Sequence, residues 1–348
     1  MNPRIAGIGT ALPAHRFAQD RLYAEALEPY FRDNPKAGKI FAHPGIAYRH
    51  SVLPDPAAFF AGRPGAGARN AVYAAEAPGL ARQAVEAALA SAGFEAAALG
   101  TLVTTTCTGY MTPGIDLKLA ATLGMAPGLR RYALGGMGCY AAFPGLNAAL
   151  ASLRSGEAER AVVSCTELCT LHFQVGSDTD NVVTTSLFAD GASAIALDAA
   201  PGPGWQVEAT RTATLYDTAE HMTWHLTDTG FQMYLSAYVP MILRDAVGSW
   251  LTGWLAERGL AVGDVQHWGI HPGGPRILDG LQAAFGLADA QLAPSRTVLR
   301  ECGNMSSATV FFILDALTAA GPRPGERAVL LAFGPGLTME GALLRWEA

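Results

Sequence analysis

Residues 135–144 read GGMGCYAAFP, a run of glycines that leads through Cys139 into a helical pattern. Glycine lets the backbone turn sharply and exposes the residue that follows. Residues 141–153 have helical character, so Cys139 is predicted to lie at a helix N-terminus. Unpaired N–H groups and the helix dipole at such a position stabilise a thiolate and lower the cysteine pKa. On these residues alone, a cysteine that only packs in a glycine-rich turn is an equally good interpretation.

Outward from this turn, short β-rich runs alternate with alanine-rich helical patterns, which is typical of α/β proteins. Strands are predicted at Arg4–Gly9, Leu102–Thr106, Ala161–Ser164, Ala192–Leu197, His267–Ile270, Ala328–Ala332 and Ala342–Trp346. Helices are predicted at Pro78–Ala92, Cys139–Ser155, Tyr238–Glu257, Pro275–Phe285 and Met305–Ala319. Residues 200–205, APGPGW, read as a connector because proline fixes φ and glycine relaxes it. We therefore predict two parts, residues 1–200 and residues 206–348, each with alternating strands and helices.

The composition of the 348 residues excludes several classes of protein. Half of the residues are apolar and 16% are charged, with 24 Lys and Arg against 30 Asp and Glu and a net charge of −6. Without a basic run, the chain has no general electrostatic footprint for nucleic acid. No apolar stretch reaches ~18 residues without glycine or proline, so we expect no membrane span. Residues 1–16 do not read as a signal peptide.

The five cysteines are an odd set without a CxxC pair. They argue against a disulfide scaffold and fit a reducing cytoplasm. The run Cys165-x3-Cys169-x2-His172 has the residue types of a metal site, but it reads better as strand and cavity positions. We expect no metal site.

Two further motifs place polar residues where α/β proteins bind ligands. His271 ends a predicted strand and is followed at once by a Pro-Gly turn, which puts its imidazole at the carboxyl edge of the sheet. A lone histidine there is more often structural. Asn304, in GNMSSAT ahead of an apolar helix, can cap that helix or donate to an oxyanion. With Cys139, these residues make a nucleophile, a proton acceptor and a neutral donor.

Several segments closely resemble motifs of the type III polyketide synthases, the chalcone and stilbene synthase-like family, in a bacterial-type member. They are GMGCYAA, HPGGPRIL, GNMSSATVFFILDAL and AFGPGLTMEGALL, in the family's order, and SLFADGASA resembles another of its segments. The resemblance implies a thiolase fold of the α/β class. Two similar βαβαβαββ-type halves would form a five-layered αβαβα arrangement, with the nucleophile in the first half, the histidine and asparagine in the second, and a homodimer as the assembly.

The resemblance also implies decarboxylative Claisen condensation. Cys139 would attack an acyl-CoA starter, and His271 would hold the thiolate as an ion pair. His271 and Asn304 would polarise the thioester carbonyl of malonyl-CoA, which agrees with the large catalytic effect of neutralising oxyanion charge. No metal or redox cofactor is implied, because CoA itself carries the substrates.

Phe188, in SLFADG, matches the family's gatekeeper between the CoA tunnel and the cavity, where its apolar face would exclude water. The family's second gate phenylalanine falls at Met233 in GFQMYL. Methionine is flexible and polarizable, so a gate of two aromatic rings is not expected here.

Four more residues match cavity positions of the family. Trp224 replaces a residue that is often glycine, and His172 replaces one that is often threonine. Their bulk predicts a smaller or redirected cavity. Cys107 resembles a cysteine that lines the cavity in bacterial members, and Ser306 is placed near the catalytic centre.

Recognition of CoA is expected from a few cations at the tunnel mouth. Lys36 and Lys39 match positions where the family uses cationic residues for the CoA phosphates, and His43 falls at the third such position. Arg276, after HPGGP, replaces a small residue and can meet the phosphate or the adenosine.

Two alternatives share the same fold. A ketoacyl-ACP synthase III-like enzyme would perform a single condensation, possibly joining two acyl chains, with an acyl carrier protein as partner. A catalytically silent binding protein is the other alternative, and the intact Cys-His-Asn set argues against it.

Overall fold

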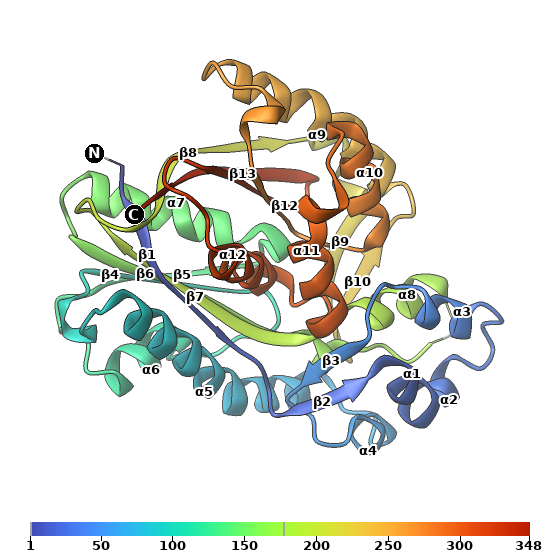
Figure 1. Ribbon diagram of the computed structural model, residues 1–348. Helices are drawn as coiled ribbons and strands as arrows, with labels where there is room; N and C mark the ends of the chain where they lie inside the picture. The colour runs from blue at the N-terminus through green and yellow to red at the C-terminus, as the bar shows by residue number, and fades with distance from the viewer. Residues whose placement is uncertain (1, 177) are drawn as a thin grey trace.

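Strand β1 (Arg4–Ala11) joins the two parts of a nine-stranded sheet in this computed structural model, which describes residues 2–176 and 178–348. The strand order is β11-β12-β13-β8-β1-β7-β6-β4-β5. β1 pairs with β7 along its length but meets β8 only at the pairs Arg4–Gln206 and Ile5–Trp205. The sheet therefore folds into two stacked parts, which Figure 1 shows above and below the helices α7 and α12.

The first part contains β1 and four further strands, with parallel pairing of β4 to both β5 and β6. These strands are β4 (Thr101–Thr106), β5 (Arg130–Gly135), β6 (Arg160–Leu168) and β7 (Asp190–Asp198). The second part comprises β8 (Gly204–Thr214), β11 (His267–Ile270), β12 (Arg327–Gly334) and β13 (Thr338–Glu347). Within it, β11 and β12 are parallel, whereas β13 is antiparallel to both β12 and β8.

Helices fill the spaces around the two sheets, so the molecule has five layers (Figure 1). The central layer is α7 (Ala142–Arg154) and α12 (Thr309–Ala319). The outer layers contain α5 (Ala66–Ala92) and α6 (Ile115–Thr122) on the first sheet, and α9 (Val239–Ala256) and α10 (Pro275–Phe285) on the second. Three large apolar clusters hold the layers together. One surrounds the central helices between the two sheets, and the other two lie beneath the outer helices of each sheet.

The high glycine and alanine content has a direct use in this packing. A Cβ atom added at Gly7 or Gly9 of β1 would lie 2.4 Å from the Ala88 carbonyl oxygen or 2.2 Å from that of Ala84. Both alanines belong to α5 and are fully buried. Only glycine lets the helix backbone come this close to the strand.

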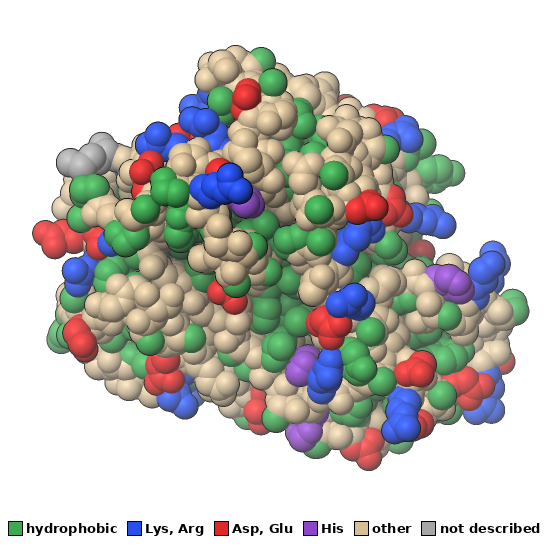
Figure 2. Space-filling view, in the orientation of Figure 1, with side chains coloured by type: hydrophobic (Ala, Val, Ile, Leu, Met, Phe, Trp, Pro, Cys, Tyr) green, Lys and Arg blue, Asp and Glu red, His purple; other side chains and the backbone are tan. Residues whose placement is uncertain are grey.

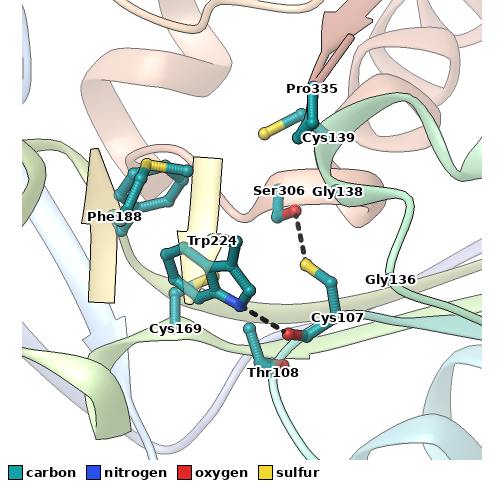
Figure 3. A pocket seen from close by; sticks show the side chains of 11 residues that line it. Cys107, Thr108, Gly136, Gly138, Cys139, Cys169, Phe188, Trp224, Ser306 and Pro335 are labelled. Atoms are coloured by element: carbon teal, nitrogen blue, oxygen red, sulfur yellow. Dashed lines mark hydrogen bonds between the residues drawn. The ribbon is translucent and has the colours of Figure 1, made fainter. Parts of the chain in front are cut away.

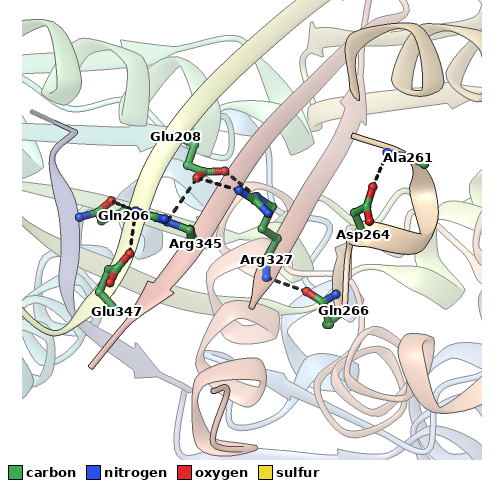
Figure 4. Close-up of polar contacts among 8 residues, drawn as sticks. All are labelled: Gln206, Glu208, Ala261, Asp264, Gln266, Arg327, Arg345 and Glu347. Carbon is green, nitrogen blue, oxygen red and sulfur yellow. Dashed lines mark hydrogen bonds and ion pairs between the residues drawn. The ribbon is translucent and has the colours of Figure 1, made fainter. Parts of the chain in front are cut away.

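Polar contacts fasten the second sheet where its strands begin and end. Glu208 of β8 pairs with Arg327 of β12, with 3.0 Å between Oε2 and Nε. The same carboxylate pairs with Arg345 of β13 at 3.4 Å, and Figure 4 shows the three side chains across neighbouring strands. The three residues are 18–38% exposed, so we assign them a local role in strand alignment and not a large share of stability.

Smaller elements cover the open end of the layers. They are β2 (His15–Ala18), α1 (Gln19–Leu22), a π-helical turn (Tyr23–Leu27), α2 (Glu28–Phe31), α3 (Ala37–Ala42), β3 (Tyr48–Ser51), α4 (Pro56–Ala61), α8 (Thr179–Leu187), β9 (Met222–Thr227), β10 (Gly230–Leu235) and α11 (Asp289–Cys302). β2 pairs with β3, and β9 pairs with β10. None of the helices in the described part of the chain is both long and apolar enough to span a bilayer.

The predicted elements are present, and β11 and α10 have the predicted bounds. Several other bounds are wrong. The helix predicted at Pro78–Ala92 begins at Ala66, so Pro78 lies inside α5, and the helix predicted from Met305 begins at Thr309 after a 3-10 turn. The predicted helix from Cys139 begins as a 3-10 turn, Gly138–Tyr140, before α7. The predicted connector 200–205 ends at Pro203, because Gly204 and Trp205 already pair in β8.

Candidate active site

Cys139 lies where the first turn of the central layer meets the end of β12. A Cβ atom added at Gly138, which has φ +74°, would lie 2.9 Å from Cδ of Pro335. One added at Gly334 would lie 2.5 Å from the Tyr140 ring and 3.5 Å from the Cys139 nitrogen. The sharp turn predicted for the glycines is present, since Gly136 and Gly138 have positive φ, but the glycines let the two backbones touch and do not expose Cys139. Cys139 itself is buried, with 5% of its surface exposed.

His271 reaches the same end of β12 from the neighbouring strand. It follows β11 directly, and its backbone N–H donates to the Leu331 carbonyl at 2.8 Å. The side chain is 1% exposed, and neither ring nitrogen has a hydrogen-bond partner among the described residues. Buried polar atoms are nearly always paired, so two orphan nitrogens on one ring are a signal of function.

Burial penalises a lone charge on either residue. It raises the pKa of Cys139 to about 12, against the opposing effect of Ser306 and Asn304, which lie within hydrogen-bonding reach of the thiol. It lowers the pKa of His271 to about 3. The predicted lowering of the cysteine pKa by the helix end is thus wrong for the thiol by itself, because desolvation outweighs it. If the Cys139 thiol passes its proton to the His271 imidazole, a thiolate and an imidazolium form as an ion pair, and neither charge is buried alone.

The backbone on either side of Phe188 fixes the position of Asn304. Its N–H donates to the Leu187 carbonyl and its carbonyl accepts from the Ala189 N–H, both at 2.9 Å. Its side-chain oxygen accepts from the Ser306 N–H at 2.8 Å. The side-chain oxygen is thus engaged in a local turn, while the amide nitrogen faces the Cys139 thiol as a donor.

A small cavity of about 30 Å³ lies beside Cys139, with a second of about 20 Å³ next to it. A water molecule needs roughly 10–15 Å³ measured in this way, so the first holds about two waters. Phe188, Trp224 and Met233 line both cavities, and Cys107 and Ser306 line the first (Figure 3). His172 lines the second. The six residues predicted for the gate and the cavity therefore gather around Cys139.

Two hydrogen bonds hold the β9–β10 hairpin against the segments that follow β4 and β6. Trp224 of β9 donates from Nε1 to the Cys107 carbonyl at 3.0 Å and stacks on Phe231, with ring centroids 5.8 Å apart. His172 Nε2 lies 2.6 Å from the Thr108 carbonyl, and its Nδ1 accepts from the Phe231 N–H at 3.2 Å. These partners fix a neutral ring protonated at Nε2, and burial lowers the His172 pKa to about 4.

Glu167, which sequence reasoning missed, forms the floor beneath this cavity. It is fully buried and accepts hydrogen bonds from the hydroxyl groups of Thr108 (2.8 Å) and Ser307 (2.5 Å) and from the Cys107 N–H (3.0 Å). Burial raises its pKa. The Cys107 thiol lies 3.4 Å from both Glu167 Oε1 and Ser306 Oγ, so the floor is one connected network.

The predicted CoA-binding cations lie outside this cavity. Lys36, Lys39, His43 and Arg276 are exposed, and none lines the cavities beside Cys139. All four residues lie near the place where the loop after α3 meets the start of α10. A Cβ atom added at Gly45 in that loop would lie 3.9 Å from Cβ of Pro275.

The same loop borders a groove of about 350 Å³ that includes Arg296 and Arg300 of α11, two cations not predicted from the sequence. Over the face in Figure 2, Lys and Arg side chains are dispersed among Asp and Glu.

The whole chain is similar to known proteins. It matches the chalcone and stilbene synthases, in their N-terminal domain over residues 50–201 and their C-terminal domain over residues 206–346. It is 36% identical to 1,3,6,8-tetrahydroxynaphthalene synthase of Streptomyces peucetius subsp. caesius, over 98% of this chain and 93% of that protein. It is 30% identical to 3,5-dihydroxyphenylacetyl-CoA synthase of Amycolatopsis balhimycina, over 99% and 93%.

Solved structures agree with these matches. The C-terminal type III polyketide synthase domain of Steely1 from Dictyostelium has a TM-score of 0.94 at 28% identity, and covers 100% of both chains. The 1,3,6,8-tetrahydroxynaphthalene synthase of Streptomyces coelicolor has a TM-score of 0.91 at 26% identity, again over 100% of both. The predicted five-layered thiolase fold is confirmed.

Proposed function

Since this chain belongs to the chalcone and stilbene synthase family, and is therefore an acyltransferase of the type III polyketide synthases, we propose that Cys139, His271 and Asn304 carry its decarboxylative condensation. One observation carries the proposal. A buried histidine with both ring nitrogens free of partners among the described residues ends its strand where Cys139 meets β12. Such a ring is available to take a proton from the thiol and to donate it to a carbonyl oxygen.

The first half-reaction loads the starter. Cys139 passes its proton to His271, and the thiolate attacks the thioester carbonyl of an acyl-CoA. The carbon–sulfur bond to CoA breaks, and CoA leaves as a thiol after taking the proton back from His271. The acyl group is then held on Cys139 as a thioester.

The second half-reaction extends the chain. His271 and the amide nitrogen of Asn304 donate to the thioester oxygen of malonyl-CoA, which stabilises the enolate that forms when CO₂ leaves. The enolate carbon attacks the acyl group on Cys139, and the Cys139 thiolate departs. The product is a β-ketoacyl-CoA that is two carbons longer, and pyrones or resorcinols arise when longer chains cyclise. The buried ring of Phe188 beside Cys139 keeps water from the enolate.

The cavity favours a small starter and few extensions. Space for about two water molecules does not hold an acyl chain, so the side chains around it must move as a chain grows. Met233 is the most flexible of them, while Trp224 is fixed by a hydrogen bond and a stacking contact. The named products of the two relatives are aromatic polyketides, and a triketide or tetraketide aromatic or pyrone is the product class that we propose here.

A starter panel tests this function. The enzyme is incubated with malonyl-CoA and acyl-CoA starters of two to twelve carbons, and the products are identified by mass spectrometry. We expect triketide or tetraketide products and an acyl adduct on Cys139. Activity confined to thioesters of an acyl carrier protein, with a single condensation, would instead support the ketosynthase alternative.

The chain forms a homodimer in this proposal. β5 ends the nine-stranded sheet and pairs only with β4 among the described strands. The edge is exposed and carries Tyr132 (39% exposed), with Tyr110 (75%) and Leu117 (41%) nearby in the chain. An unpaired edge with exposed aromatic residues is a template for pairing with a second copy.

Light scattering tests the dimer. We expect a mass of twice 36.4 kDa for the wild type, and a shift toward the monomer for Tyr132→Lys. A wild-type protein that stays at the monomer mass at micromolar concentration contradicts the assembly.

The substrate would enter from the exposed region of Lys36, Lys39 and Arg276, whose cations suit the CoA phosphates. CoA itself carries the substrates, and the proposed steps use no metal or redox cofactor. We place the reaction in the cytoplasm, where the five free cysteines stay reduced.

A further inference from the structure

The segment that leads into the gate is fastened from outside by an unusual set of hydrogen bonds. α8 ends at Leu187, one residue before Phe188. The Thr185 and Phe188 carbonyls both accept from Nη1 of Arg49, at 2.5 and 2.9 Å. The Ser186 carbonyl accepts from the Gln19 side chain at 2.9 Å. A helix normally leaves its last carbonyls to water or to a local turn, so donors from β3 and α1 mark this end as deliberately held.

Arg49 is a buried cation that forms no ion pair with any carboxylate in the described part of the chain. It is 1% exposed and lies between two rings, with its guanidinium carbon 6.0 Å from the centre of Phe41 and 5.4 Å from that of Phe173. Asp190, the nearest acid that acts on it, is hydrogen-bonded to Thr170 and to the Val52 N–H instead. The negative end of the α8 dipole is therefore its main direct partner.

The remaining nitrogens of Arg49 lower the stability of the folded protein. Nε and Nη2 are buried and have no hydrogen-bond partner within residues 2–176 and 178–348. An unsatisfied buried donor destabilises the folded state, which offsets part of what the bonds to Thr185 and Phe188 contribute. A role in stability is therefore a weak explanation for an arginine at this position.

Arg49 also touches the backbone that places Asn304. Gly303 has φ +75°, and a Cβ added there would lie 3.1 Å from Cγ of Arg49 and 3.0 Å from Cβ of Ala189. Asn304 is in turn bound to Leu187 and Ala189 through its own backbone. One side chain thus supports two residues of the proposed decarboxylation site, the ring of Phe188 and the carboxamide of Asn304, although it does not line the cavity.

We infer that Arg49 is a positioning residue for the decarboxylation of malonyl-CoA, acting through Phe188 and Asn304. The inference rests on the proposed function of Asn304. Starter loading requires the Cys139 thiol and His271, which Arg49 does not hold, and uses Asn304 only as one donor to the thiol. The loss of Arg49 should therefore slow decarboxylation more than starter loading. Loss of the Arg49 side chain displaces Phe188 and Asn304, which meet malonyl-CoA, and leaves Cys139 in place.

The test compares Arg49→Met and Arg49→Lys with a matched control, Arg69→Met. Arg69 is equally buried, at 2% exposure, and likewise donates from Nη1 to two carbonyls, those of Leu171 and Phe173, both at 2.8 Å. Those carbonyls do not belong to the gate segment. Starter loading is followed by the mass of the acyl-enzyme, and decarboxylation by the release of acetyl-CoA from malonyl-CoA.

We expect Arg49→Met to lower the decarboxylation kcat about tenfold or more relative to starter loading, because small displacements of positioning groups have effects of that size. Arg49→Lys keeps the charge but not both hydrogen bonds, so its ratio should lie between those of Arg49→Met and the wild type. Arg69→Met should lose stability to a similar extent with the ratio of the two rates unchanged.

The inference is overturned if the ratio in Arg49→Met equals that in Arg69→Met. If Arg49→Met does not fold, Arg49→Lys decides: a ratio below that of the wild type supports the role, and an equal ratio overturns it. A wild type that neither loads a starter nor decarboxylates malonyl-CoA contradicts the proposed function itself, before Arg49 is considered.

Discussion

Two walls of the site around Cys139, one at His271 after β11 and one at Glu167 on β6, treat their polar atoms in opposite ways, although neither side chain lines the cavity itself. At the first wall, His271 is buried with both ring nitrogens unpaired among the described residues. On the floor toward β6, Glu167 is equally buried but accepts hydrogen bonds from Thr108, Ser307 and the Cys107 backbone. Unpaired polar groups are free to bind a substrate, whereas a fully hydrogen-bonded network fixes the shape of the site.

The contrast assigns different work to the two walls. In the proposed mechanism, the wall with His271 performs proton transfer and carbonyl activation, because its ring nitrogens are free for substrate. The floor and the β9–β10 hairpin fix the size of the cavity, because Trp224 and His172 are held there by hydrogen bonds. Changes on the first wall should therefore affect rate, and changes on the second should affect product and stability.

Cys139→Ala should have the largest effect. Without the thiol there is no atom to carry the starter, so we expect no acyl mass increment on the protein after incubation with an acyl-CoA. Cys107→Ala and Cys169→Ala are the controls, since both thiols line the same cavity. An adduct that persists on the Cys139→Ala protein would move the nucleophile to another residue.

His271→Ala should come next, and it tests the proton transfer directly. Burial alone raises the pKa of Cys139 to about 12, so without a proton acceptor the thiol stays protonated at pH 7. We expect iodoacetamide to alkylate Cys139 of the wild type at neutral pH. In His271→Ala the rate should fall by roughly 10²-fold or more at pH 7 and then rise about tenfold per pH unit, following the thiolate fraction. Equal rates in both proteins at pH 7 would remove His271 from the activation of the thiol.

Trp224→Ala should change the product more than the rate. The indole lines both small cavities, so its removal should enlarge the space beside Cys139 and let a longer chain grow. We expect products with at least one additional extension from the same starter, measured by mass spectrometry, at a similar rate of starter loading. Trp224→Phe keeps an aromatic ring against Phe231 and should keep the wild-type product length. An unchanged product from Trp224→Ala would show that another residue limits the chain.

The sequence predicted the fold best where turn chemistry and an apolar run coincide. β11 ends at the Pro-Gly turn after His271, and α10 ends at Gly286 in the left-handed conformation, so both have the predicted bounds. β5 and β8 were missed because they do not read as apolar strands. β5 begins with two arginines on an exposed edge, and β8 alternates buried residues with charged ones such as Glu208.

The proposed catalytic residues could be singled out from the sequence, but their pKa values could not. Motif context singled out Cys139, His271 and Asn304, and the pairing of β11 with β12 brings the first two to one strand end. The direction of the Cys139 pKa depends on burial, which no local pattern reports. Glu167 was missed because its donors come from distant segments of the chain, such as Thr108 and Ser307, and only the fold brings them together.

Glu167→Gln should have the smallest effect on catalysis and a measurable one on stability. An amide replaces one acceptor oxygen with an NH₂ group that faces either the Ser307 hydroxyl or the Thr108 hydroxyl, so we expect a loss of roughly 1–3 kcal/mol in the free energy of unfolding. Cys139 alkylation should not slow, because the Glu167 charge raises the pKa of Cys139 and the amide removes that charge.

The loss of stability caused by Glu167→Gln should depend on pH. Burial raises the folded-state pKa of Glu167 above its ordinary 4.5, so the folded protein binds this proton more tightly than the unfolded chain. The stability of the wild type relative to Glu167→Gln should therefore fall as pH rises from 4.5 through the raised pKa, and urea unfolding at several pH values measures it. A difference that grows with pH would mean that the network favours the carboxylate. In that case the floor would be a charged site held by its donors, and the two walls would differ in charge as well as in pairing.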